Sequence, residues 1–270
     1  CLLSRGLGDV YKRQSHNSVS QKAAVNSSAR EVLALIARDL RNTGYYHIDF
    51  ENNNCEALNQ SQYDYIGVTH NKNWINGKYK QSDGLMVTYS ISAKERIRIQ
   101  YFMTKYQNSS EWYLKRVVNV NPIGHSRSGC GPWTRNYNMP VDDEVLAPYV
   151  EDFQVIPKDK EGNVVFPVCT SCSNYENSQG GQTKSKENMK KVNTVDIYLT
   201  LRSPKEVFAR AKPTKIINGA SPYGSNIDVP ADKFFRETFF VSVHTRNLAK
   251  HVALSEKTGT SIGETSTYNK

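Results

Sequence analysis

The most regular hydrophobic pattern in the chain predicts a helix over residues 22–44. Its apolar positions recur at steps of three and four and share one face: Val25, Ala29, Val32 or Leu33, Ile36 and Leu40. Charged residues fill the other sides: Arg30, Glu31, Arg38, Asp39 and Arg41. Gly44 is typical of a helix end, and Arg41 in the last turn complements the helix dipole. No start signal precedes residue 22, which indicates the end of a longer helix.

From residue 83 the period changes to that of strands. Three runs, 84–91, 97–106 and 111–120, are apolar or alternating and are joined by short polar links, which predicts an antiparallel meander. One face of the second run carries Ile97, Ile99, Tyr101 and Met103. One face of the third run carries Trp112, Leu114 and Arg116.

The second half of the chain continues the strand pattern with longer interruptions. We expect a turn leading into a strand over 144–156, a turn at 159–162, an edge strand at 164–168, a strand at 192–203 and a last strand at 233–248. The run 192–203 is the clearest, since its apolar residues alternate strictly: Val195, Ile197, Leu199 and Leu201. Polar segments at 45–82, 121–140, 169–191 and 204–231 are expected to be loops.

Together these elements predict an α+β fold. One amphipathic helix packs on an antiparallel sheet of about six or seven strands with long loops, because each buries the apolar side of the other. The expected division is a leader (1–14), the helix (15–44), an irregular loop (45–82), the sheet domain (83–250) and a disordered tail (251–270).

The first fourteen residues are set apart from this fold. The segment GLGDVYKRQ (6–14) resembles a translated sequencing-adaptor tail and has none of the features of a signal peptide. We expect residues 1–14 to be an artefact; a native disordered leader is the alternative. Leaving out their three basic residues and one acidic residue lowers the net charge from +9 to +7.

Composition excludes several classes of protein. Of 270 residues, 38% are hydrophobic, with 16 Tyr, 9 Phe and 3 Trp, which is enough for a core and excludes wholesale disorder. No stretch approaches the roughly 18 apolar residues that a membrane span needs. The positive charge is interleaved with acidic residues along the chain, so it permits contact with nucleic acid, anionic lipid or acidic glycans without selecting one.

Without Cys1, four cysteines remain: Cys55, Cys130, Cys169 and Cys172. An even number in a polar, loop-rich chain indicates an oxidising compartment and disulfides. We favour the pairs Cys55–Cys130 and Cys169–Cys172, because a C-x-x-C pair can close within a turn. One alternative is a four-thiolate zinc site, but such a site usually has two C-x-x-C motifs and the chain has one. The other is a redox C-x-x-C, but that motif usually begins a helix, and none is expected here.

The sequence contains no motif of a catalytic site. It lacks the G-x-S-x-G, H-E-x-x-H, G-x-x-x-x-G-K-[ST] and G-x-G-x-x-G patterns, and its six histidines have no ligand spacing. The acidic triplet 142–144 could bind a cation, but it lacks the spaced ligands of a calcium loop, which favours a solvated turn. We therefore expect no enzyme activity and no cofactor.

One loop combines cations with aromatic rings. Its residues are Lys72, Trp74, Lys78, Tyr79 and Lys80. Lysines can contact phosphates while Trp and Tyr rings stack on bases, so this loop is a candidate for contact with nucleic acid or another polyanion. A solvated loop is the alternative, and we favour it.

Four segments have the order and spacing found in one protein family. They are EVLALIARDLRNTGYY (31–46), EDFQVIPKDKEG (151–162), VDIYLTLRSP (195–204) and FFVSVHTRNL (239–248). The first resembles the end of the first helix in PilW-type minor pilins of type IV pili, which reads close to LARDLR-x-x-GY. The last two resemble the penultimate strand, ending in Arg-Ser, and the last strand, closing near V-x-x-RN. The resemblance covers roughly residues 20–250.

The resemblance implies a structural subunit that takes part in pilus assembly and priming, twitching motility or adhesion. It implies that 15–44 is the C-terminal part of the pilin helix, and that a prepilin leader and an apolar helix anchored in the inner membrane are missing through truncation of the gene model. The implied partners are other minor pilins and the major pilin, first in the inner membrane and periplasm and then on the cell surface. Val25, Val32, Ile36 and Leu40 would face the domain's own sheet or a neighbouring helix.

Three alternatives stay open. The J-type pseudopilin of type II secretion shares the plan of helix and sheet. A basic extracellular domain that binds DNA or another polyanion would use the loop with Lys72, Lys78 and Lys80. An enzyme would use the C-x-x-C pair.

Overall fold

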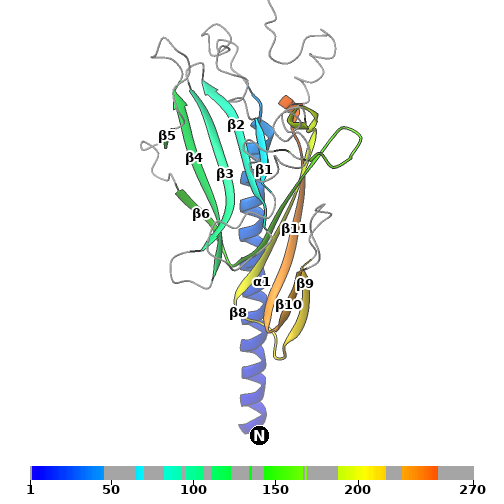
Figure 1. Ribbon diagram of the computed structural model, residues 1–270. Helices are drawn as coiled ribbons and strands as arrows, with labels where there is room; N and C mark the ends of the chain where they lie inside the picture. Colours follow the sequence, from blue (N-terminus) through cyan, green and yellow to red (C-terminus); the bar gives the residue numbers. More distant parts are fainter. Residues whose placement is uncertain are drawn as a thin grey trace, which may run out of the picture.

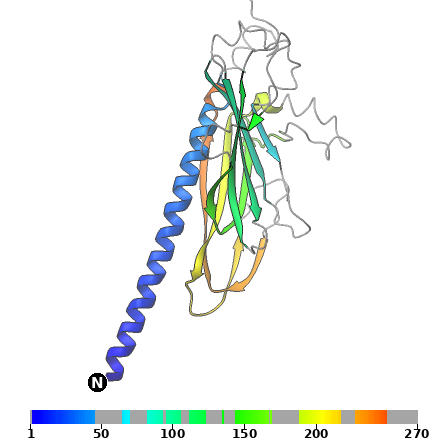
Figure 2. The same cartoon turned by 90° about the vertical axis from the view of Figure 1, so that its left-hand side faces the viewer.

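The computed structural model describes residues 2–45, 65–69, 82–92, 95–105, 111–122, 134–135, 143–166, 168, 188–216 and 227–248. Within these ranges, one long helix lies along antiparallel sheets and projects beyond them at its N-terminal end (Figures 1 and 2). This arrangement confirms the expected α+β class.

The helix α1 (Leu2–Asn42) is much longer than the expected 22–44. Residues 2–14, which we set apart from the fold, continue it as helical backbone. Once its C-terminal half is fixed by packing, each further turn adds hydrogen bonds without a new nucleation cost, so a polar segment can extend the helix. No helix in the described part of the chain has a stretch that is long and apolar enough to cross a membrane.

Six strands form the larger sheet. They are β1 (Ile66–Thr69), β2 (Gly84–Ser92), β3 (Glu95–Lys105), β4 (Trp112–Pro122), β5 (Thr134–Arg135) and β6 (Asp143–Pro148). The expected meander β2–β3–β4 is confirmed, with Leu85 opposite Tyr101 and Tyr101 opposite Arg116. Both β5 and β6 pair with β4.

The second sheet has three strands in the order β11–β8–β7. They are β7 (Val150–Lys158), β8 (Thr194–Glu206) and β11 (Phe234–His244), all antiparallel. A separate hairpin, β9 (Lys212–Ile216) with β10 (Ile227–Asp232), lies between β8 and β11 in the chain. The chain passes from the larger sheet to the smaller one at Tyr149, which has the left-handed φ of 59°.

The core forms where the apolar stripe of α1 meets both sheets. The helix packs mainly on β8 and β11 and also touches β2 and β6. The expected inward faces of the strands are buried: Ile97, Ile99, Tyr101 and Met103 in β3, and Val195, Ile197, Leu199 and Leu201 in β8. One helix thus packs against both sheets. The alternating apolar residues of β3 and β8 are the ones that face this shared core.

Several expectations about strands were wrong in detail. The run 144–156 forms two strands in different sheets, because the turn at Tyr149 redirects the chain. Within the described residues 164–166 and 168, the expected edge strand 164–168 makes one β-bridge, Lys158 to Val164. Segments expected to be loops contain β5, β9 and β10, which are short and mostly polar and become strands by pairing with neighbours. The segment 45–82, expected to be a long loop with short elements, contains β1, whose Ile66 and Val68 are buried.

Candidate functional site

The most unusual feature of the described chain is the carboxylate of Asp39, which is fully buried in the last turns of α1. We expected Asp39 on the polar side of the helix, and that expectation was wrong. It sits between the buried positions Ile36 and Leu40 on the sheet-facing side. A charge that is removed from water must be paired and hydrogen-bonded, so its neighbours define the site.

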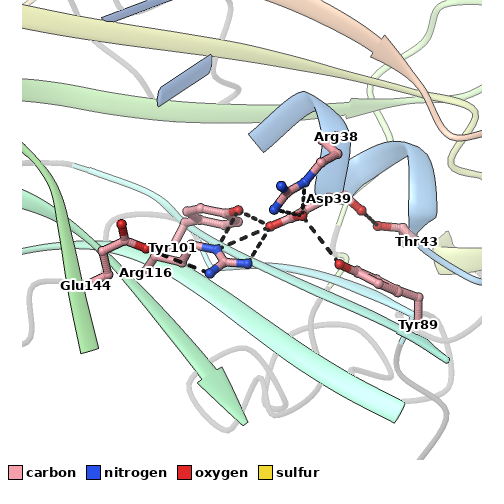
Figure 3. Close-up of polar contacts among 7 residues, drawn as sticks. All are labelled: Arg38, Asp39, Thr43, Tyr89, Tyr101, Arg116 and Glu144. Carbon is pink, nitrogen blue, oxygen red and sulfur yellow. Dashed lines mark hydrogen bonds and ion pairs between the residues drawn. The ribbon is translucent and has the colours of Figure 1, made fainter. Parts of the chain in front are cut away.

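Three strands supply those neighbours, as Figure 3 shows. From β3, the Tyr101 hydroxyl donates to Asp39 Oδ2 at 2.5 Å. From β4, Arg116 donates to the same oxygen through Nη2 at 3.1 Å and Nε at 3.3 Å. From β2, the Tyr89 hydroxyl lies 3.4 Å from Oδ1, which also accepts from Arg38 Nη2 at 3.1 Å. We call Asp39, Tyr89, Tyr101 and Arg116 the Asp39 cluster.

The period of the strands explains why these side chains converge. Tyr101 shares a face of β3 with Ile97, Ile99 and Met103, and Arg116 stands opposite Tyr101 on β4. Since alternate residues of a strand point to one side, both polar side chains arrive on the face that α1 covers. The polar groups are therefore placed by the same alternation that builds the core.

Burial and neighbouring charges keep the two phenols and Arg116 in one ionisation state. Burial first, and then the charge of Asp39, raise the pKa of the Tyr89 phenol to about 12. The same causes raise the pKa of the Tyr101 phenol. Burial by itself lowers the pKa of Arg116, but Tyr101 and Asp39 outweigh it and the pKa is raised. Both phenols are therefore protonated donors and Arg116 is a cation at any ordinary pH.

This arrangement is suited to holding elements together. The carboxylate is occupied by donors on both oxygens, and Arg116 Nη1 also lies 3.9 Å from Glu144 on β6. Donors from β2, β3 and β4 thus converge on one residue of α1, which sets the height and rotation of the helix on the larger sheet. Among the residues that the structure describes, no three His, Cys, Asp or Glu side chains lie close enough to hold a metal ion.

The end of α1 is tied down next to this cluster. Gly44, with φ +77°, donates its N–H to the carbonyl of Thr88 on β2 at 3.0 Å. The Thr43 hydroxyl donates to the Asp39 carbonyl at 3.2 Å, and Asn247, after β11, donates its side-chain amide to the Arg41 carbonyl at 3.1 Å. The last carbonyls and amides of the helix are thus bonded to two different strands or their ends.

A second polar junction joins the two sheets. Ahead of β2, Asp83 donates its N–H to the Phe153 carbonyl at 2.8 Å and accepts the Val155 N–H at 2.9 Å. Ser82 accepts the Phe153 N–H at 3.3 Å. These residues occupy an edge of β7 as a partner strand would. Burial raises the pKa of the adjacent Asp152, which is 1% exposed, to about 7, although the Gln154 amide donates to it at 2.9 Å.

The candidate residues from the sequence fall into three groups. Val25, Val32, Ile36 and Leu40 are buried against the chain's own sheets, and their contact with a neighbouring subunit stays a prediction. Glu144, from the acidic triplet, pairs with Arg116. The remaining candidates lie outside the described residues: Cys55, Cys130, Cys169, Cys172, Lys72, Trp74, Lys78, Tyr79 and Lys80.

Sequence reasoning missed the Asp39 cluster although two signals were present. Arg116 shares a strand face with Trp112 and Leu114, and a charged residue on an apolar face calls for a buried partner. Asp39 lies within one turn of both Ile36 and Leu40, at the border of the apolar stripe. Together, these signals could have suggested a buried pair between helix and sheet.

Comparison with known proteins gives a match to solved structures only. No protein-family model matches the chain, and no curated protein matches it. Among solved structures, the chain is similar to a type IV-like pilin from Thermus thermophilus. The sequences are 14% identical, the match covers 83% of this chain and 96% of that chain, and the TM-score is 0.44.

Proposed function

We propose that this chain is a pilin-type structural subunit, and more narrowly a PilW-type minor pilin that takes part in assembly of a type IV pilus. The observation that carries the proposal is the helix. Its C-terminal half is buried in the domain, while its N-terminal end projects beyond the sheets (Figure 2). The segments that resemble PilW-type pilins include the end of this helix, 31–46.

The Asp39 cluster supports the mechanical part of this role. A subunit held in a filament through its helix must transmit force from the helix to its outer domain without slipping. A buried ion pair with directed hydrogen bonds resists sliding and rotation better than apolar contacts alone, because it is strong only in one geometry. Buried apolar side chains from Val25 to Leu40 supply the bulk of the attachment.

The projecting part of α1 provides the surface for neighbours. From residue 15 to residue 20 its side chains are exposed or half-exposed, and Val19 is 64% exposed. We propose other minor pilins and the major pilin as the partners of this surface. The subunit would be held in the inner membrane through a preceding helix and later in the pilus at the cell surface, and we propose neither an enzymatic role nor a cofactor.

The test is crosslinking in cells that express the gene from its native start. A photoreactive residue at Val19 is expected to give adducts with pilus subunits, while the same residue at Ile91, which is 46% exposed on β2, is the control. Adducts with type II secretion subunits would favour the pseudopilin alternative. Absence of any pilin adduct from Val19 would contradict the proposal.

The polyanion-binding alternative rests on a loop that the structure does not describe. It depends on Lys72, Trp74, Lys78, Tyr79 and Lys80, which lie outside the described residues. It therefore stays a sequence-based prediction.

A further inference from the structure

A cationic turn forms the end of the domain from which α1 projects. Figures 1 and 2 place the turn between β8 and β9 at the lower end of the sheets, level with the lower half of the helix. We call residues 205–212 together with Lys233 the basal tip. Its cations are Lys205, Arg210, Lys212 and Lys233, and Glu206 is its one acidic residue.

These cations are available to a partner. The residues Lys205, Arg210 and Lys212 are exposed, and the side chain of Lys233 is 44% exposed. Glu206 neutralises part of the charge, since its carboxylate lies 3.6 Å from the Lys233 ammonium. The other three cations leave the basal tip clearly positive, which suits an anionic surface.

Hydrogen bonds hold the basal tip in one shape. The N–H groups of Val207 and Phe208 both donate to the Lys233 carbonyl, at 2.8 and 2.9 Å. The Ser203 hydroxyl donates to the Lys205 carbonyl at 2.7 Å and accepts the Phe235 N–H at 3.0 Å. A surface that is already ordered loses little conformational entropy when it binds.

Side-chain contacts also hold the strand ends next to the basal tip in place. Arg236 donates through both terminal nitrogens to Asp232, each at 2.6 Å, and its side chain is 4% exposed. The Arg202 guanidinium lies 4.1 Å from the centre of the Phe234 ring. These contacts secure the C-terminal part of β8, the end of β10 and the first residues of β11, which together carry the basal tip.

An aromatic ring lies among the cations. Phe208 is half-buried, and the Lys212 ammonium lies 4.6 Å from the centre of its ring, while Ala209 and Ala211 are exposed. Basic side chains combined with an aromatic ring are common where proteins meet the headgroup region of a bilayer. Duplex DNA and acidic glycans would use only the charges, so among these anionic partners the apolar component favours lipid.

The helix determines which way this surface faces. Lys22 of α1 lies with its ammonium 5.3 Å from the centre of the Phe235 ring, beside the basal tip, and the preceding residues run on past it. From residue 15 to residue 24 the helix contains no acidic residue that would repel an anionic surface. A bilayer that held the helix at the level where it leaves the sheets (Figure 2) would therefore face the basal tip.

We infer that the basal tip docks on the anionic headgroups of a lipid bilayer while the helix anchors the subunit there. This inference rests on the proposed function, because a membrane-held helix is what brings the domain to the bilayer. The contact would orient the domain before it enters a filament. It uses residues that no part of the Asp39 cluster touches.

The test is sedimentation of the full chain with lipid vesicles at low and high salt. Vesicles of phosphatidylcholine alone are compared with vesicles that also contain phosphatidylglycerol. The tip variant is Lys205→Gln, Arg210→Gln, Lys212→Gln. The matched control, Arg41→Gln, Lys191→Gln, Arg246→Gln, removes the same charge from exposed positions at the opposite end of the domain. An unchanged thermal midpoint shows that each variant is folded.

We expect salt-sensitive binding to the phosphatidylglycerol vesicles only. Each basic residue near such a surface strengthens binding about fivefold, so the tip variant should bind roughly a hundredfold more weakly while the control keeps wild-type binding. Equal losses in both variants, or no preference for phosphatidylglycerol, would overturn the inference. Displacement from the vesicles by duplex DNA at a lower concentration of phosphate would assign the tip to nucleic acid and would also overturn it.

The experiment is independent of the test of the proposed function. Vesicle binding requires no other pilus subunit, so its failure leaves the crosslinking result at Val19 unaffected. Conversely, loss of the Val19 adducts with vesicle binding retained would remove the filament role and leave the lipid contact in place.

Discussion

At the scale of single residues, Asp39 shows how one buried charge can set the position of a helix. Its carboxylate accepts from Tyr101 and Arg116 on the sheet and has no exposure to water. Such a pair contributes modestly compared with apolar residues of the same shape, but losing one member leaves a buried group that nothing satisfies. The cluster therefore specifies one arrangement of helix and sheet more than it adds stability.

Substitution of Asp39 tests this argument. The change Asp39→Ala is expected to lower the free energy of unfolding by about 3–5 kcal/mol, because Arg116, which is only 14% exposed, loses its nearest carboxylate and the buried Tyr101 hydroxyl loses its acceptor. Urea denaturation measures the change. The double variant Asp39→Leu, Arg116→Met should recover part of the loss.

The control for this test is Arg38, whose side chain is 61% exposed while it pairs with the same carboxylate. An exposed pair contributes about 0–1 kcal/mol, so Arg38→Gln should have little effect on unfolding. A loss from Arg38→Gln as large as that from Asp39→Ala would contradict the assigned role of Arg116.

Asp152 gives the chain a pH-dependent stability. Burial raises its pKa from the usual 3.8 to about 7 in the folded protein, so the folded state keeps a proton that the unfolded state has released. The contribution of Asp152 to stability is therefore greatest below pH 4 and is lost as the pH rises toward 7. Asp152→Asn should remove this dependence and stabilise the protein at pH 8 by roughly 4 kcal/mol. Urea denaturation of the wild type and of Asp152→Asn at pH 5 and pH 8 measures the free energy of unfolding. The same change with pH in both proteins would exclude a raised pKa of Asp152.

At the scale of elements, the end of α1 depends on a position that only glycine fits. Gly44 has φ +77°, and a Cβ atom there would lie 2.6 Å from Leu248 Cδ2. Glycine thus serves two needs at once, the left-handed turn that ends the helix and the close approach of the segment after β11.

The substitution Gly44→Ala should therefore destabilise the protein by about 2 kcal/mol or more, which adds the displacement of Leu248 to the strain of the left-handed backbone. Gly162→Ala is the matched control: φ is +87°, but a Cβ would meet nothing within 4 Å, so only about 1 kcal/mol of strain is expected. Thermal unfolding measures the midpoint of both variants. Equal decreases in the midpoint would show that the contact with Leu248 does not contribute to the loss of stability.

At the scale of the whole molecule, the helix links two sheets at one end and leaves them at the other. Its buried side chains begin at Val25, among the residues whose side chains are described. Ser82 and Asp83 occupy an edge of β7, so the two sheets are also joined without the helix. The domain should therefore be stable without the projecting part.

Removal of residues 1–20 is expected to change the free energy of unfolding by less than about 1 kcal/mol, since a helical segment that projects beyond the sheets (Figure 2) adds little to a packed domain. By contrast, Leu40→Ala at a fully buried position should cost about 2–5 kcal/mol. Urea denaturation of both variants tests whether the buried part of the helix, and not the projecting part, stabilises the domain. Unfolding of the truncated chain would mean that the projecting segment is part of the core.

Much of the secondary structure could be predicted from local patterns. The amphipathic stripe of α1 and the alternation in β3 and β8 were visible because burial on one face leaves a fixed period in the sequence. The hairpin β9–β10 was not visible, since its strands have polar, proline-containing sequences and exist through pairing with each other. The split of 144–156 into two strands depended on the backbone turn at Tyr149, which periodicity does not record.

Local conformational preference and the period of burial are enough to predict the α+β class, the end of the helix at Gly44 and the apolar faces. The burial of Asp39, its contacts with Tyr101 and Arg116, and the position of Asp83 beside β7 arise only when the chain is folded. Those contacts join residues more than sixty positions apart in the chain. Their energy depends on distance and desolvation in the folded protein, which no local pattern of residues contains.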